Sequence, residues 1–150
     1  MAGAANRRTT LKITNSTRDV ARLFSHMDWA GFEPVPRGIP AEKTINFEHM
    51  ADARGSRGAV VYEVGNGYRW LLAWANQPSW AGQTPVDNQV YTNILDVWEN
   101  INWDDISSLL DRANSTSNHA RDGFTSAATI DPNGPEPILR AELVQVPLGN

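Results

Sequence analysis

The sequence contains no cysteine, no long apolar run and no cluster of basic charge. Without cysteine the chain can form neither a disulfide scaffold nor a zinc–thiolate site, and it has no thiol nucleophile. A helix that crosses a bilayer needs about twenty apolar residues, and no stretch approaches that length. The formal net charge is −4, and Arg7 and Arg8 are the only adjacent pair among 13 scattered Lys and Arg residues. Duplex binding requires a dense basic surface, so nucleic acid is not an expected partner.

The sequence also lacks the motifs that identify most enzymes. It has no G-x-S-x-G nucleophile elbow and no H-E-x-x-H pair. Its three histidines, His26, His49 and His119, are far apart and show no metal-ligand spacing. We therefore expect a binding protein rather than an enzyme, with no catalytic residue, cofactor or metal ion.

The first ten residues carry two arginines but no following apolar segment, so they do not resemble an export signal. We expect residues 1–10 to be a flexible N-terminus and residues 11–150 to form one domain, because 150 residues with 41% hydrophobic content fill one core. The expected location is cytoplasmic, or outside the cell by release without a signal peptide, with contact to membranes only at their periphery.

A β-hairpin is the strongest local signal. Residues 58–64 (GAVVYEV) are rich in β-branched side chains, residues 65–67 (Gly-Asn-Gly) suit a tight turn, and residues 68–75 fold back on the first strand. Alternating or extended patterns predict further strands at 11–15, with Leu11 and Ile13 facing inward, and at 21–29, 44–48, 86–97 with a break near Asn93, and 139–146.

One helix is predicted at residues 104–114. Its apolar residues follow helical spacing, and Asn102 is suited to cap its N-terminus. The apolar residues are Ile106, Leu109, Leu110 and Ala113. Many short strands with a single helix predict a mainly β fold, an antiparallel β-sandwich with one short amphipathic helix packed on a face.

The segment after the hairpin is the first candidate binding region. Asn76, Ser79 and Trp80 lie among Pro78, Gly82 and Pro85, a composition typical of a rigid recognition loop. Trp80 is either an anchor in the membrane interface or a side chain folded back onto the loop's own core.

Four further residues are candidate ligand contacts. Trp74 and Tyr91 either border a pocket or pack in the core. Arg54 and Arg57 flank Gly55-Ser56, and such a pair either binds a phosphate or forms a solvated turn.

Several short segments occur in the order and spacing of a known family. They are residues 11–17 (LKITNST), 39–42 (IPAE), 55–62 (GSRGAVVY), 70–74 (WLLAW), 87–91 (DNQVY) and the pair Gly123-Phe124. Over most of residues 11–146 the chain resembles the actinoporin-like β-sandwich, and within it the nakanori and jasmonate-induced protein group. Sea-anemone cytolysins and fungal fruit-body lectins share this fold. The resemblance implies a protein that binds at membrane or glycan surfaces.

The sequence departs from the actinoporin pattern in two places. Only about ten small and polar residues precede the first predicted strand, so we expect no pore-forming helix and no leakage of vesicles by the protein alone. The predicted helix carries no tyrosine, so an aromatic cage for choline is incomplete. With Arg54 and Arg57 available for a phosphate and Asp111 for an amine, we expect a phosphoethanolamine-type lipid or a glycan ahead of free phosphocholine.

Three functional hypotheses remain open. The first is binding of a membrane lipid headgroup, such as that of a sphingolipid. The second is a lectin of the same fold, in which the side-chain amides of Asn76, Gln77, Asn88 and Gln89 bind sugar hydroxyls. The third is a stress-related module that contacts another protein. An oligomer is compatible with each hypothesis.

Overall fold

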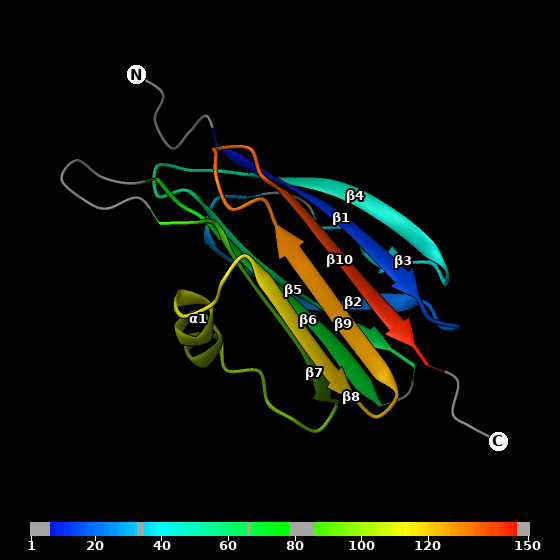
Figure 1. Cartoon of the computed structure of the whole chain (residues 1–150). Helices are drawn as coiled ribbons and strands as arrows, with labels where there is room; N and C mark the ends of the chain where they lie inside the picture. The colour runs from blue at the N-terminus through cyan, green and yellow to red at the C-terminus, as the bar shows by residue number, and fades with distance from the viewer. Residues whose placement is uncertain (1–6, 33–34, 66, 79–85, 147–150) are drawn as a thin grey trace.

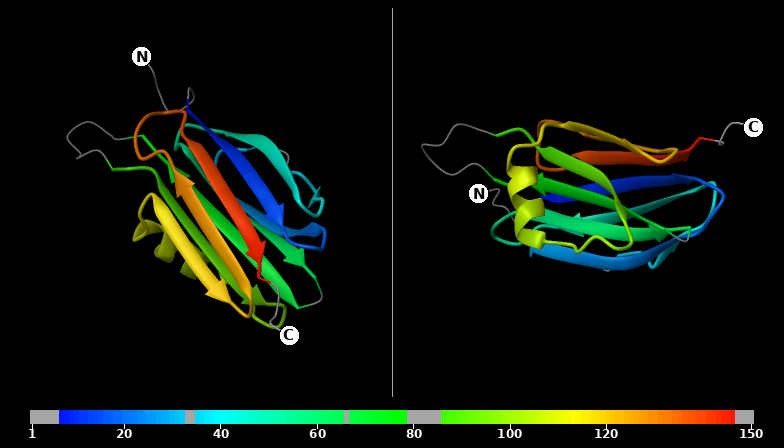
Figure 2. Two further views of the ribbon diagram at one scale, coloured as in Figure 1. Left: turned by 45° about the vertical axis from the view of Figure 1, so that its right-hand side comes forward. Right: turned by 90° about the horizontal axis from the view of Figure 1, so that it is seen from below.

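The computed structural model describes residues 7–32, 35–65, 67–78 and 86–146, which form two five-stranded sheets packed face to face (Figure 1). Sheet 1 contains, in spatial order, β4 (Lys43–Met50), β1 (Arg8–Ser16), β10 (Ile138–Gln145), β9 (Phe124–Ile130) and β8 (Thr116–Arg121). Sheet 2 contains β3 (Gly38–Ile39), β2 (Ala21–Ala30), β5 (Ser56–Val64), β6 (Tyr68–Asn76) and β7 (Gln89–Asp96). The helix α1 (Trp103–Asp111) lies outside the two layers, next to β6 and β7 (Figure 2). The predicted β-sandwich with one short helix is confirmed.

The main core lies between the sheets and is formed by alternate residues of their strands. Leu11 and Ile13 of β1 are fully buried there, as the alternation in the sequence predicts. The strands β5 and β6 are buried on both faces, because their other side chains pack under α1. Ile106 and Leu110 of the helix complete this second cluster, whereas Leu109 is exposed.

Several strands and the helix begin or end at residues other than those predicted from the sequence. β1 begins at Arg8, so residues 8–10 belong to the sheet rather than to a flexible terminus. It pairs with β10 in parallel, the one parallel pair among the described strands of an otherwise antiparallel fold. β7 continues through Asn93 without a break, because its ladder to β6 is regular from Gln89 to Asp96. The helix begins one residue earlier than expected and ends at Asp111, with Asn102 at its N-cap.

Three strands are present that the hydrophobic pattern did not indicate: β3, β8 and β9. β8 is a polar edge strand without an apolar alternation. β9 buries alternate residues, but Ser126 and Ala128 separate its two large inward side chains, Phe124 and Ile130, which weakens the pattern. Both strands are held by ladder hydrogen bonds to neighbouring strands. No helix in the described part of the chain is long and apolar enough to span a bilayer.

Candidate functional site

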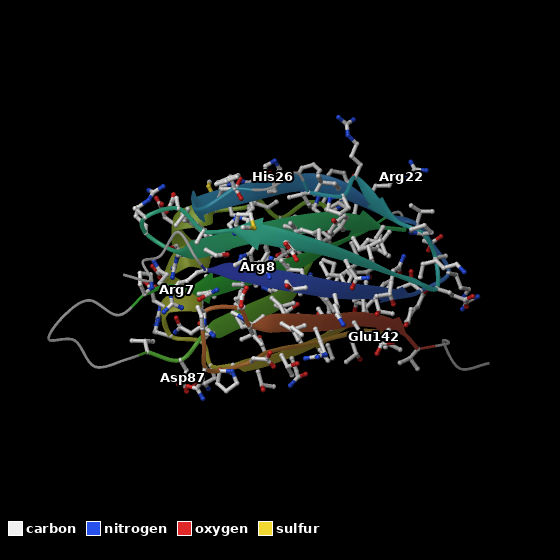
Figure 3. The ribbon with its side chains drawn as sticks, turned by 90° about the horizontal axis from the view of Figure 1, so that it is seen from above. Arg7, Arg8, Arg22, His26, Asp87 and Glu142 are labelled. Carbon is white, nitrogen blue, oxygen red and sulfur yellow. The ribbon has the colours of Figure 1, made fainter. Side chains whose placement is uncertain are left out.

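One end of the sandwich collects most of the candidate residues. The strands β2, β4 and β6 end there, and β1, β5 and β7 begin there, as the antiparallel registers require. We call it the loop end. Figure 3 shows Arg7, Arg8 and Asp87 at this end of the molecule.

Asn76 is a fixed polar group at the loop end. It is the last residue of β6 and is fully buried. Its side-chain nitrogen donates to the carbonyl oxygens of Arg8 and Pro135, each at 3.2 Å, and its Oδ1 accepts a hydrogen bond of 2.8 Å from Arg7. Asn76 therefore joins β6, the start of β1 and the segment before β10. Because Asn76 is fully buried, it can influence a ligand only by positioning the groups around it.

Trp74 and Tyr91 lie on opposite faces of sheet 2. Trp74 is 1% exposed in the core, edge-on to His49 with ring centroids 5.1 Å apart. Its Nε1 has no hydrogen-bond partner among the described residues. Tyr91 packs in the cluster under α1, where burial raises the pKa of its hydroxyl and Asn93 donates a hydrogen bond to its oxygen. The structure therefore does not bring these two rings together at a surface pocket.

Arg54 and Arg57 each have a carboxylate partner. The Arg54 guanidinium lies 2.7 Å from Asp52, and this hydrogen bond holds the pKa of Asp52 well below its usual range. Arg57 points to the outer face of sheet 2 and donates to the carbonyl oxygen and the hydroxyl of Ser107 and to Asp111. The expectation that Arg57 is available for a phosphate and Asp111 for an amine is corrected, because they pair with each other.

Gln77 connects the two arginines. Its Nε2 donates to the carbonyl oxygen of Arg54 at 3.4 Å, and its Oε1 accepts from Arg57 at 3.3 Å. The remaining candidates, Ser79 and Trp80, lie outside the described residues, and their roles stay predictions.

Among the described residues of the loop end, two large apolar side chains are exposed that sequence reasoning missed. Phe32 follows β2, pairs with Met50 at the end of β4 and is 61% exposed. Val86, before β7, is 70% exposed and borders a hollow of about 490 Å³ between the start of β7 and the segments around Asn114 and Pro132. The proline- and glycine-rich context of Phe32 was the available signal, since such segments run at surfaces.

A buried polar network connects the two sheets just inside the loop end. His49 Nδ1 and Ser56 Oγ are 2.7 Å apart, His49 Nε2 lies 2.8 Å from Asp28, and Ser56 shares a hydrogen bond of 2.9 Å with Thr9. The order of serine, histidine and aspartate resembles a hydrolase triad. Ser56 is fully buried, however, so its hydroxyl is not accessible to a substrate and the network has a structural role. Within the described ranges no group of acidic and histidine side chains is arranged to hold a metal ion.

The fold defines a class of two-sheet sandwiches that includes a lipid-binding protein and a lectin. The crystal structure of the lipid binding protein Nakanori superposes with a TM-score of 0.81 and 18% identity, covering 97% of this chain and 73% of that one. The wild-type Xerocomus chrysenteron lectin superposes with a TM-score of 0.60 and 8% identity, covering 91% and 98%.

Sequence comparison identifies the family. The model of the Nakanori-like protein family matches residues 6–143, and the chain belongs to this family. The chain is also 30% identical over 124 residues to a jasmonate-induced protein homolog of Atriplex canescens. That match covers 76% of this chain and 66% of the relative, slightly under two thirds of its length. The resemblance to the nakanori and jasmonate-induced protein group is thereby confirmed.

Proposed function

We propose that the protein binds membrane lipids peripherally through its loop end, as a binding protein without catalytic activity. The observation that carries this proposal is the exposure of Phe32 and Val86 at that end. Full burial of a Phe or Val side chain contributes about 1.5–3 kcal/mol, so two such side chains supply useful membrane affinity. The structural similarity to the lipid binding protein Nakanori and the chain's membership of the Nakanori-like family support the same function.

The side-chain amides at the loop end favour a lipid over a glycan there. Asn88 donates to the carbonyl oxygens of Asp131 and Gly134, and Gln89 donates to those of Asp111 and Ala113. Asn76 and Gln77 are engaged as described above. A sugar that binds the donors of these amides would have to break these bonds, and this is costly at Asn76 and Asn88, which are buried.

A vesicle pelleting assay tests the proposal. Phe32→Ala combined with Val86→Ala should weaken binding to sphingolipid-containing vesicles by about tenfold or more, because both apolar side chains are lost from the interface. Trp98→Ala is the matched control. Trp98 is 88% exposed but follows the end of β7, at the opposite end of the sandwich. Loss of binding in the control with retention in the double variant would contradict the proposal.

The finer proposal is that the lipid is a sphingolipid. Vesicles with equal headgroups on a sphingoid or a glycerol backbone separate the two lipid classes. Equal binding to both would refute sphingolipid selectivity and leave general lipid binding in place.

The second candidate function is binding of a glycan on the outer face of sheet 1. A hollow of about 420 Å³ lies there over Ala127, and Lys12, Thr129 and Arg140 line it with donors suited to sugar hydroxyls. The wild-type protein on a glycan array, compared with Lys12→Ala combined with Arg140→Ala, tests this alternative. It is rejected if no glycan binds or if the variant binds equally.

A further inference from the structure

Arg7 is a partly buried cation without a carboxylate partner in the described part of the chain. Its neighbours at the loop end differ in this respect: Arg8 pairs with Glu136, Arg54 with Asp52 and Arg57 with Asp111. Burial lowers the pKa of the Arg7 guanidinium, since desolvation disfavours its charged form. An anion next to Arg7 would offset this cost.

The Arg7 side chain is held in one place by Asn76. The Asn76 amide nitrogen donates to two backbone carbonyl oxygens, so a flipped amide would lose both hydrogen bonds. Its Oδ1 therefore has to face Arg7, which donates to it through Nη1 at 2.8 Å. This contact uses one of the five N–H donors of a guanidinium, and among the described residues no other side-chain hydrogen bond engages the remaining donors.

We propose that Arg7, oriented by Asn76, binds the phosphate of a lipid headgroup at the loop end. This inference rests on the proposed lipid-binding function and names the chemical group that is recognised. A guanidinium presents two parallel N–H donors to a phosphate and is preorganised here by a fully buried residue. Phe32 and Val86 belong to the same end, so the apolar and the anionic parts of a lipid both find a partner there.

Vesicle binding of two neighbouring charge variants provides the first test. The probe is vesicles that contain ceramide phosphoethanolamine. Arg7→Gln should weaken binding by about tenfold or more, because a hydrogen bond to a charged group is lost. Arg8→Gln is the matched control, with the same change of charge at a residue already paired with Glu48 and Glu136. Equal effects of the two substitutions would show a general electrostatic attraction and overturn the assignment to Arg7.

Titration with inorganic phosphate provides the second test and separates the two proposals. In nuclear magnetic resonance spectra the side-chain signals of Arg7 and Asn76 should shift and saturate in the wild-type protein, and the shift at Asn76 should be absent in Arg7→Gln. Thermal unfolding of the variant verifies that it is folded. If phosphate shifts the signals of Arg7 and Asn76 but the protein does not bind vesicles, the anion site is supported and lipid binding is refuted. Vesicle binding without any change at Arg7 would refute the anion site alone.

Discussion

The guanidinium of Arg57 lies 2.9 Å from the carboxylate of Asp111, and this is one of several contacts by which Arg57 attaches α1 to the outer face of sheet 2. Arg57 also donates to the carbonyl oxygen of Ser107 at 3.0 Å and stacks over Trp29, with 5.5 Å from its guanidinium carbon to the ring centroid. One side chain thus connects β5, β2 and the helix.

Arg57→Met should therefore destabilise the protein much more than Asp111→Asn. The first substitution removes several hydrogen bonds of a nearly buried guanidinium, with an expected loss of about 2–3 kcal/mol. The second alters a carboxylate that is 66% exposed, for which less than about 1 kcal/mol is expected. Urea unfolding measures both free energies. Equal losses would mean that the ion pair, rather than the contacts to Ser107 and Trp29, holds the helix.

Asn76→Asp should be strongly destabilising although it changes little in size. The carboxylate cannot donate to the carbonyl oxygens of Arg8 and Pro135, and the charge is fully buried. We expect a loss of about 2 kcal/mol or more, because two buried carbonyl oxygens lose their donor and Arg7, which contacts Oδ1, compensates the buried charge only in part. Asn46→Asp, on the exposed face of β4, is the control and should change the unfolding free energy by less than about 0.5 kcal/mol. A stable Asn76→Asp variant would contradict the role given to this residue.

Gly58→Ala tests the close packing inside the loop end. A Cβ at this position would lie 2.8 Å from the Trp74 ring and 3.2 Å from His49 Nε2. We expect a lowered melting temperature, equivalent to about 1–3 kcal/mol of overpacking. Gly67→Ala meets no atom within 4 Å and should leave the melting temperature nearly unchanged. Equal melting temperatures for the two variants would show that Trp74 and His49 move aside without cost.

The sequence was most informative where side chains alternate and least informative where neighbours determine the structure. The hairpin of β5 and β6 was predicted because its strands are apolar and its turn is rich in glycine. The hairpin of β8 and β9 was missed because β8 is polar and β9 has only small or polar residues between Phe124 and Ile130, although Asp122-Gly123, with φ of 49° and 87°, was a usable turn signal.

The candidate site was harder to predict than the fold. Residue type alone marked Arg54 and Arg57 as cations available to a ligand, but in the structure each is paired with a carboxylate. The partner of Arg54, Asp52, is a neighbour in sequence, whereas Asp111 is brought to Arg57 by the fold. Arg7 was assigned to a flexible terminus because no apolar pattern precedes Leu11. Its contact with Asn76, 69 residues away in sequence, could be seen only in the structure.

The absence of cysteine permits a direct test of the central claim that the loop end contacts lipid, since a single introduced cysteine is the only labelling site. An environment-sensitive fluorophore is attached to Val86→Cys in one variant and to Trp98→Cys in another, at opposite ends of the sandwich. With sphingolipid-containing vesicles, the account predicts a blue shift and increased emission for the label at position 86 and no change at position 98. A blue shift at position 98 alone, or at neither position while the protein is bound, would contradict it.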